Sequence, residues 1–340
     1  MNYWGETLAE GYIVLAEERT DVRYGHPPTE RPIEGYIHLG VVVLDKPHGP
    51  TSHQVSAWVK EILSVKRAGH SGTLDPHTTG VLPVAIENAT RALKYITERP
   101  KEYIALMKLH GDVPLKRLEV LAREFTGEIY QMPPLRSAVK RQLRTRRVHY
   151  IKILEAEGRE VLLRVKCDPG TYIRTLIHDM GEVLGVGANM VELRRISSGP
   201  FREENLVTLQ DLKDAVVFWR EEGIEEELRR VIRPFEDIFR GMGEVYVKDS
   251  AVDALAHGSD LYFPGVVKLS GGIRKGDVVV VKTLKGEAVC VGTSEENASS
   301  YSRGRSGVAV RIEKVFMPPG VYPKGWAEKR RVEPKGPEGI

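Results

Sequence analysis

Residues 69–80 read GHSGTLDPHTTG, and the interpretation of the whole chain starts from this stretch. It holds a single acid, Asp75, between bounding glycines, and Pro76 restricts the backbone directly after it. Considered alone, an aspartate before a proline is most often a turn former. The spacing matches neither the GxxxxGK(S/T) phosphate loop nor the GxGxxG dinucleotide fingerprint. A bound nucleotide cofactor is therefore poorly supported.

Strands and helices alternate irregularly on both sides of this stretch. Apolar runs predict strands at residues 40–44, 81–86, 102–109, 147–154, 161–167 and 192–196. Helical spacing predicts a helix capped by Thr51 or Ser52, one near 115–125, one capped by Thr171, one from Thr208 and a helical stretch at 224–232. Because there is no regular βαβα order, we expect an α+β fold with a mixed, largely antiparallel sheet flanked by helices.

Beyond residue 244 the chain changes to short strands punctuated by glycine. These strands are predicted at residues 245–247, 276–281, 287–292 and 307–315, and they indicate a separate small β domain that resembles a barrel. We predict four parts: an arm at 1–35 that packs on the C-terminal domain, a catalytic domain at 36–240, the β domain at 244–318 and an extended tail at 319–340. A chain of 340 residues is long enough for two compact cores.

The charge distribution is more informative than the net charge of +3. Six basic residues and no acid lie between residues 136 and 147, which favours a polyanion-binding face, although a solvated loop is the commoner fate of such a run. The two cysteines are far apart, so neither a disulfide scaffold nor a zinc site is expected. No apolar run approaches the ~20 residues of a membrane helix. We expect an intracellular protein without a membrane partner.

Several other residues have both a structural and a functional reading. Lys46 precedes a helix N-terminus, where it could bind phosphate or be merely solvated. Arg174 could pair with a carboxylate and keep it ionised. Tyr103 and Tyr172 could each stack on an unpaired base, although a tyrosine is more often a packing residue. His70 is more often a hydrogen-bonded loop residue than a base.

The combination of these segments resembles a known family. The motifs LDKPHGPTS, GHSGTLDPHTTG, KEYIALMKLHGD, QMPPLRSAVK, GTYIRTLIHDMG and MVELRRISSGPF occur in this order between about residues 40 and 201. Together they resemble the TruB-type pseudouridine synthases. With its arm and its β domain, which looks like a PUA domain, the whole chain resembles the H/ACA guide-RNA-dependent branch, the dyskerin family. It lacks the lysine-rich tails of the eukaryotic members and looks archaeal.

The resemblance implies roles for individual residues. Asp75 would be the essential catalytic carboxylate, Arg174 its ion-pair partner, and Tyr103 the aromatic residue that stacks on the target base and can transfer a proton. Lys46 would brace the catalytic loop, and His70 would occupy the place of the flipped base. Tyr172 and Leu193 would line the pocket. The residues implied in RNA binding are Arg136, Lys140, Arg141, Arg144, Arg146 and Arg147 in the basic run, and Gly258, Ser259, Leu261 and Pro264 in the β domain.

The resemblance also implies partners. These are an H/ACA guide RNA, a substrate rRNA, possible tRNA substrates modified at the T-loop uridine, and the other H/ACA core proteins: a small zinc-ribbon-type protein, a Gar-type protein and a kink-turn-binding ribosomal-type protein. No cofactor and no metal are implied, and an archaeal member would be cytoplasmic.

The reaction breaks the N1–C1′ glycosidic bond of uridine, rotates the base and rejoins it through C5. With one acid in the central motif, Asp75 either attacks the sugar or abstracts a sugar proton, and the sequence leaves both routes open. Three rival functions remain: a non-catalytic RNA-binding scaffold, a base-excising glycosylase and a metal-dependent nuclease. The glycosylase would use the same carboxylate and would release free uracil, and the nuclease needs a cluster of acids or histidines that the sequence does not show. A paired-carboxylate mechanism would need a second carboxylate motif.

Overall fold

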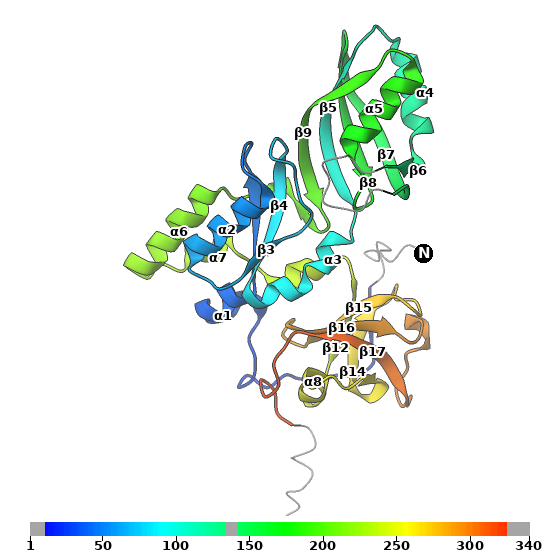
Figure 1. Cartoon of the computed structure of the whole chain (residues 1–340). Coiled ribbons are helices and arrows are strands. Elements are labelled where there is room, and N and C mark those ends of the chain that lie inside the picture. The colour runs from blue at the N-terminus through cyan, green and yellow to red at the C-terminus, as the bar shows by residue number, and fades with distance from the viewer. Residues whose placement is uncertain (1–10, 133–141, 325–340) are drawn as a thin grey trace, which may run out of the picture. The chain divides into compact units, whose positions relative to one another are not determined.

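The computed structural model describes residues 11–132 and 142–324, which fall into two compact units (Figure 1). Residues Ile37–Arg233 form the catalytic unit, and the N-terminal segment up to Tyr36 joins the chain from Pro234 onward in the β unit. The compact catalytic unit thus ends at Arg233, a few residues before the predicted domain boundary at residue 240. Phe235 and Phe239 explain this difference, because both rings pack against Phe316 of the β unit.

The catalytic unit is built on one large sheet with the strand order β11-β2-β4-β9-β5-β8-β7-β6, and β3 and β10 pair at its side with β4 and β9. Its strands are β2 (Gly40–Lys46), β3 (Ala68–His70), β4 (Thr79–Ile86), β5 (Lys101–Leu109), β6 (Gly127–Gln131), β7 (Arg144–Glu157), β8 (Glu160–Cys167), β9 (Ala188–Ser198), β10 (Phe201–Arg202) and β11 (Arg233–Pro234). β4 and β9 run parallel, whereas β2–β4, β5–β9, β5–β8, β7–β8 and β6–β7 are antiparallel. The predicted mixed, largely antiparallel sheet is confirmed.

The helices of the catalytic unit are α2 (Ser52–Leu63), α3 (Lys94–Thr97), α4 (Leu115–Glu124), α5 (Ile173–Leu184), α6 (Leu209–Glu222) and α7 (Glu226–Val231), and α1 (Ile33–His38) crosses the boundary between the units. Five of them, α2, α4, α5, α6 and α7, were predicted, whereas α1 and α3 were not. Thr51 and Thr208 cap α2 and α6 with full capping boxes. The cap predicted at Thr171 is wrong, because the Thr171 hydroxyl donates to the carbonyl of Asp168 and Tyr172 is the N-cap of α5.

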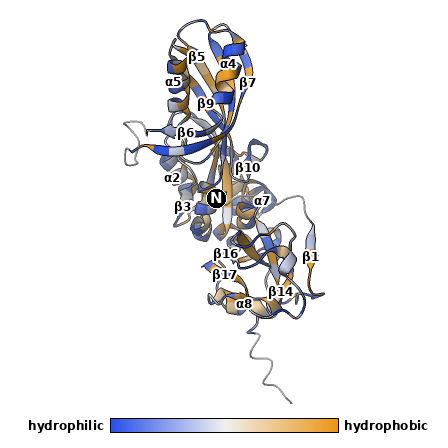
Figure 2. Cartoon of the chain, turned by 90° about the vertical axis from the view of Figure 1, so that its right-hand side faces the viewer, coloured by the Kyte–Doolittle hydropathy of each residue, from blue (hydrophilic) through white to orange (hydrophobic). Residues whose placement is uncertain are grey.

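Amphipathic packing places these helices against the sheet. In α4, residues Leu118, Leu121 and Ala122 are buried at a spacing of three and four, which puts them on one face. Figure 2 shows the result along α4, where hydrophobic and hydrophilic residues both appear. Helix α5 buries six residues in the same manner and contacts β9. This packing stabilises the strands that carry the candidate site.

The β unit has a sheet with the order β1-β14-β12-β15-β16-β17-β13. Its elements are β1 (Tyr12–Val14), β12 (Gly243–Val247), α8 (Asp249–Ala256), β13 (Leu261–Tyr262), β14 (Val266–Ser270), β15 (Val278–Thr283), β16 (Ala288–Ser294) and β17 (Val308–Val315). β1 belongs to the arm and pairs with β14, and the next residue, Leu15, is buried in the core of this unit. β14 and α8 were not predicted.

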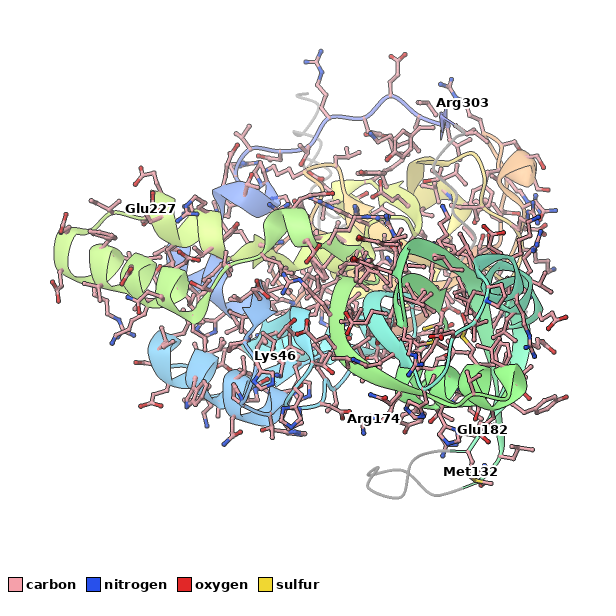
Figure 3. The ribbon with its side chains drawn as sticks, turned by 90° about the horizontal axis from the view of Figure 1, so that it is seen from above. Lys46, Met132, Arg174, Glu182, Glu227 and Arg303 are labelled. Atoms are coloured by element: carbon pink, nitrogen blue, oxygen red, sulfur yellow. The ribbon has the colours of Figure 1, made fainter. Side chains whose placement is uncertain are left out.

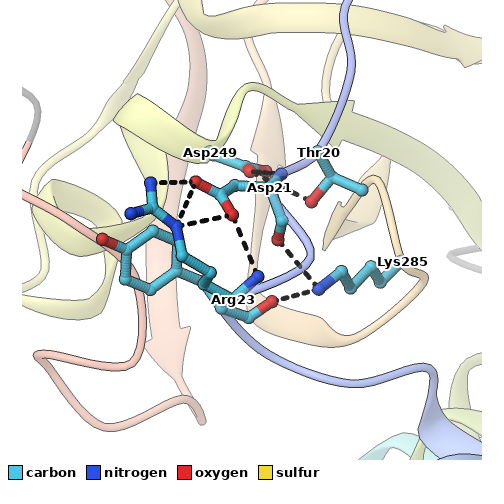
Figure 4. A network of polar contacts seen from close by, with 6 residues as sticks. Thr20, Asp21, Arg23, Asp249 and Lys285 are labelled. Carbon is cyan, nitrogen blue, oxygen red and sulfur yellow. Dashed lines mark hydrogen bonds and ion pairs between the residues drawn. The ribbon is translucent and has the colours of Figure 1, made fainter.

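Polar contacts attach the arm to the β unit (Figure 4). Asp249 accepts hydrogen bonds from the Thr20 hydroxyl (3.0 Å) and the Asp21 amide (2.8 Å). The Lys285 ammonium donates to three arm carbonyls, those of Asp21 (3.0 Å), Gly25 (3.2 Å) and Tyr24. In this network one carboxylate and one ammonium of the β unit hold the arm.

The segment predicted as an extended tail from residue 319 contributes to the same core. Tyr322 is only 2% exposed, lies in the apolar cluster of the β unit and donates a 2.7 Å hydrogen bond to Glu287. The boundary at 318 is thus too early, because the sequence pattern did not show that a ring this far along returns to the core. Residues 325–340 lie outside the described part of the chain.

Candidate active site

The catalytic loop, residues 71–78, connects β3 to β4 and presents Asp75 at a tight turn. The amide of Thr78 donates to the Asp75 carbonyl at 3.0 Å. On the other side of Asp75, the Ser52 hydroxyl accepts from the Leu74 amide at 2.8 Å and donates to the Leu74 carbonyl at 3.0 Å. Because Ser52 stands in the first turn of α2, this helix holds the backbone next to the acid. The acid itself remains exposed.

Lys46 lies beneath the loop at the end of β2. Its side chain is fully buried, and its ammonium donates to the carbonyls of Pro47 (2.9 Å), Pro76 (3.1 Å) and Thr78 (3.0 Å). Burial lowers the pKa of Lys46, and the nearby negative charge of Asp75 acts in the opposite direction. An ammonium has three protons, so these three acceptors satisfy it. The bracing position expected for Lys46 is what the geometry provides.

Arg174 forms an ion pair with Asp75 across 99 positions of sequence, with 2.6 Å between Nη2 and Oδ2. Both side chains are more than half exposed, 56% for Arg174 and 58% for Asp75, and such surface pairs contribute only about 0–1 kcal/mol to stability. Arg174 also stands in the first turn of α5, where a cation opposes the helix dipole. The pair is therefore better explained by the orientation of an accessible carboxylate than by stability. Figure 3 labels Arg174, together with Lys46, among the side chains of the structure.

Tyr103 on β5 is 9% exposed and lies opposite Arg195 of β9. Burial raises the pKa of Tyr103, and the Arg195 guanidinium partly offsets this rise through its charge and a hydrogen bond. The charge of Asp75 also acts on this phenol, in the upward direction. Tyr103 is thus a neutral hydroxyl at physiological pH and lies within the electrostatic reach of the carboxylate.

His70 ends β3 and is tied to α2. Its Nδ1 is 3.0 Å from the Ser56 hydroxyl, and its ring meets the His53 ring edge-on at 4.7 Å between centroids. Burial, together with the charges of His53 and Arg195, lowers the pKa of His70 to about 4. The imidazole is therefore neutral at physiological pH.

The two predicted pocket residues are positioned by neighbouring strands. Tyr172 has its amide and carbonyl bound by the side-chain amide of the buried Gln131, at 2.9 and 3.1 Å. Leu193 is half-buried on β9, two residues before Arg195, so both side chains lie on the same face of the strand. β9 also pairs with β5, which carries Tyr103. The roles of Tyr172 and Leu193 in a pocket remain predictions.

The basic run is only partly described. Arg136, Lys140 and Arg141 lie outside the described residues. On β7, Arg147 is exposed, whereas Arg144 and Arg146 are half-buried. The Arg146 guanidinium lies against Gly170, where an added Cβ would come within 3.0 Å of Nη2. Arg146 therefore has a packing role beside any role in RNA binding.

The residues predicted to contact RNA in the β unit also differ in exposure. Gly258, Ser259 and Pro264 are exposed, and Gly258 has a φ of +92° with open space around its α-carbon. Leu261 is 1% exposed, because its side chain is part of the apolar core. The RNA contact expected at this loop therefore has to use the backbone near Leu261 and not its buried side chain, and it stays a prediction.

Three residues that organise the site were missed by the sequence interpretation: Ser52, Gln131 and Arg195. Ser52 was considered only as a helix cap, and Gln131 stood in a motif without a role of its own. Arg195 had a usable signal. It is an arginine on a predicted strand, two residues after Leu193, where alternation puts both side chains on the buried face.

Comparisons with known proteins decide the family. The TruB family pseudouridylate synthase N-terminal domain matches residues 60–173, and the tRNA pseudouridylate synthase B C-terminal domain matches residues 174–240. A PUA domain matches residues 243–316, and a DKCLD (NUC011) domain matches residues 7–56. The probable tRNA pseudouridine synthase B of Methanopyrus kandleri is 54% identical over 93% of this chain and 94% of its own length. The chain belongs to the TruB family of pseudouridine synthases.

Further TruB-family relatives and solved structures agree. The probable tRNA pseudouridine synthase B of Pyrococcus abyssi is 55% identical over 92% of this chain and 95% of its own. The protein in an H/ACA ribonucleoprotein bound to a substrate RNA containing 2′-deoxyuridine superposes with a TM-score of 0.87 at 50% identity, covering 94% of this chain and 99% of its own. A Cbf5–Nop10–Gar1 complex matches with a TM-score of 0.86 at 52% identity, covering 94% and 98%. The chain is thus an isomerase with a pseudouridine synthase fold and a PUA domain.

Proposed function

We propose that Asp75 drives the isomerisation of uridine to pseudouridine in a guide-directed ribonucleoprotein. The supporting observation is that the backbone around Asp75 is fixed whereas its carboxylate is exposed. The backbone of the catalytic loop is fixed by buried groups, whereas the Asp75 carboxylate is exposed and paired only with an equally exposed arginine, Arg174. A carboxylate of this kind is both rigidly placed and accessible to a nucleotide, as a catalytic group must be.

The target uridine must leave its stack to reach Asp75, which costs a few kcal/mol. Stacking of the extruded base on Tyr103 would offset about 1–3 kcal/mol of this. The N1–C1′ bond then breaks, the base rotates, a C5–C1′ bond forms, and the proton on C5 is lost while N1 gains one. The two routes for Asp75 are attack at C1′ or removal of a sugar proton. Both use the carboxylate in its ionised form, and Arg174 orients it through the 2.6 Å contact.

Tyr103 supports the last step in this scheme. Its phenol is neutral, and burial raises its pKa further. It can therefore take the C5 proton only while its own hydroxyl proton passes on to the N1 that gains one, which leaves the phenol neutral. Arg195 beside it prevents the rise from being larger. A neutral hydroxyl near Asp75 is suited to carry the C5 proton away from the base.

We further propose that an H/ACA guide RNA selects the uridine in rRNA. The support is the similarity of nearly the whole chain to the protein of an H/ACA ribonucleoprotein bound to substrate RNA, and to the Cbf5 of complexes with Nop10 and Gar1. Partners of those kinds are expected here, together with a kink-turn-binding protein held through the guide. The PUA domain would bind the guide through the exposed loop at Gly258 and Ser259.

Transfer RNA is a second proposed substrate, because the archaeal relatives carry the name tRNA pseudouridine synthase B. The T-loop uridine would be modified without a guide.

Within residues 11–132 and 142–324, the structure has no helix long and apolar enough to cross a membrane. We place the protein in the cytoplasm of an archaeal cell.

One reconstitution tests these statements together. Purified protein is incubated with substrate rRNA with and without guide RNA and core proteins, and pseudouridine is mapped at single positions. Asp75→Asn should reduce product formation more than a thousandfold while RNA binding stays within twofold. Asp112→Asn is the matched control, because Asp112 also forms an exposed pair with an arginine, Arg159 at 2.7 Å. A tenth of the activity left in Asp75→Asn contradicts the catalytic assignment, and equal modification without guide contradicts the guided one.

A further inference from the structure

Arg195 is an almost fully buried arginine at the centre of the catalytic unit, with 1% of its surface exposed. Its guanidinium donates to three backbone carbonyls: Val81 at 2.8 Å, Gly72 at 2.9 Å and Ser71 at 3.4 Å. In the sequence, Ser71 and Gly72 come before Asp75, and Val81 comes after it. One side chain thus joins the start of the loop to the strand that follows it.

Burying a guanidinium without a counter-ion is unfavourable, because its charge loses the solvation of water. No ion pair between Arg195 and a carboxylate is found in the part of the chain that the structure describes. Its guanidinium donates to backbone carbonyls, and Arg195 lies opposite Tyr103 on the neighbouring strand. A leucine or methionine would fill a strand position of the same sheet at lower cost. The arginine therefore has a use beyond packing.

We propose that Arg195 is a positioning residue that ties Tyr103 to the catalytic loop, so that the phenol and the Asp75 carboxylate keep a fixed separation when the uridine enters. This inference rests on the proposed catalytic role of Asp75. Tyr103 and Arg195 are opposite each other on β5 and β9, and the other donors of the same guanidinium hold the loop. The planar fork of five N–H donors can serve both sides at once, which the single ammonium of a lysine cannot.

The loop leaves room for this guanidinium at a glycine. Gly72 has a φ of +70°, and an added Cβ would lie 3.1 Å from Nη1 of Arg195. Gly80, with a φ of +97°, lets β4 approach β9 so closely that a Cβ would lie 2.2 Å from the Arg195 carbonyl. Gly72 and Gly80, one on each side of Asp75, therefore both leave space for atoms of Arg195.

Lys46 completes the arrangement from the other end of the loop. Arg195 holds Ser71 and Gly72 before Asp75, and Lys46 holds Pro76 and Thr78 after it. Of Lys46 and Arg195, only Arg195 also lies opposite Tyr103 on the neighbouring strand. Loss of Arg195 should therefore affect the relation between the phenol and the carboxylate rather than the grip on RNA.

The test compares two adjacent arginines, Arg195→Lys and Arg194→Lys. Arg194 is half-exposed and pairs with Asp45 at 2.9 Å and Glu203 at 2.6 Å, so it is a matched control outside the site. Single-turnover rates are measured on saturating guide–substrate RNA, and RNA affinity is measured separately. Arg195→Lys should slow the rate at least thirtyfold with RNA affinity within threefold, and Arg194→Lys should change neither by more than threefold.

A double variant with Tyr103→Phe shows whether Arg195 acts through the phenol. The double variant should be no slower than the slower single variant, because both changes remove one linkage. An Arg195→Lys rate within threefold of the wild type, or a double variant whose losses multiply, overturns the inference. Asp75→Asn is measured in the same assay to distinguish a failure of this inference from a failure of the proposed function. An active Asp75→Asn variant would contradict the catalytic role of Asp75.

If Arg195→Lys does not fold, Gly72→Ala replaces it. The new methyl would press on the guanidinium, and the rate should fall about tenfold. Gly158→Ala is its control, because Gly158 also has a positive φ (+56°) but nothing within 4 Å of an added Cβ. Equal rates for the two glycine variants overturn the proposal.

Discussion

The two units use buried charges in different ways. In the catalytic unit the buried Lys46 and Arg195 donate to three backbone carbonyls each. In the β unit the buried charges that hold the structure include acids. Glu236 pairs with the buried Arg31 at 2.6 Å, and Glu287 accepts from the Tyr322 hydroxyl at 2.7 Å and from the His26 amide at 3.1 Å.

This difference separates an acid that reacts from acids that support the fold. Cations bound to carbonyls fix the catalytic loop without using a carboxylate, so Asp75 stays exposed beside Arg174. In the β unit each oxygen of Glu287 already accepts hydrogen bonds, which leaves little capacity for chemistry. Burial and partners distinguish the two kinds of acid, although both are ordinary carboxylates in the sequence.

Among the changes that test this comparison, Lys46→Met is expected to have the largest effect on the rate. It leaves three carbonyls under the loop without their donor, at a cost of about 1–3 kcal/mol for each one that water cannot reach. We expect the free energy of unfolding to fall by about 3 kcal/mol and the single-turnover rate to fall at least a hundredfold. Denaturant unfolding and rates on bound RNA measure the two effects.

Lys285→Met is the counterpart in the β unit, because Lys285 also donates to three carbonyls. This change should loosen the arm and leave the rate on saturating RNA within twofold. A Lys46→Met rate within threefold of the wild type would show that the loop keeps its shape without the buried ammonium.

The next effect concerns stability alone. Arg31→Met leaves the carboxylate of Glu236 buried without its partner, which should lower the free energy of unfolding by about 3–5 kcal/mol. The unfolding transition of the β unit is expected to move to lower temperature, and the rate on bound RNA should not change.

The double variant Arg31→Met with Glu236→Met is the control, because it also removes the Glu236 carboxylate that Arg31→Met alone leaves without its partner. It should recover at least half of the lost stability, since apolar replacements of a buried ion pair are often tolerated. No recovery would mean that the hydrogen bond from the Ala288 amide to Glu236 (2.9 Å) matters more than the ion pair.

The sequence interpretation predicted the sheet and a helix cap at Thr51 or Ser52, because each leaves a local pattern, and the family motifs implied the pairing of Asp75 with Arg174. It expected little water around Asp75, whereas 58% of the side chain is exposed, because exposure depends on contacts between distant segments. Apolar runs, capping residues and the residues of recognisable motifs need no knowledge of distant contacts. The arm strand at Tyr12, the return of Tyr322 to the core and the carbonyl partners of Arg195 depend on contacts between residues far apart in the chain. No local pattern encodes which carbonyl a buried guanidinium meets, so these had to come from the structure.

The smallest effect tests a titratable group beside the loop. Burial, His53 and Arg195 lower the pKa of His70 to about 4, whereas an unfolded histidine titrates near 6.5. Between these values the unfolded chain binds a proton that the folded chain does not, so stability falls as pH drops from about 6.5 to about 4 and does not change above that window.

The loss for wild-type protein should be no more than about 2 kcal/mol, because His70 is only partly buried and solvent screens its charge. His70→Gln removes the titrating ring, so its unfolding free energy should fall less between pH 7 and pH 4.5 than that of the wild type. Parallel curves for the two proteins would contradict the depressed pKa. The same argument applies to the reaction, because a neutral ring can take the place of an extruded base without a charge to desolvate, and activity should therefore show no His70 titration near pH 6.5.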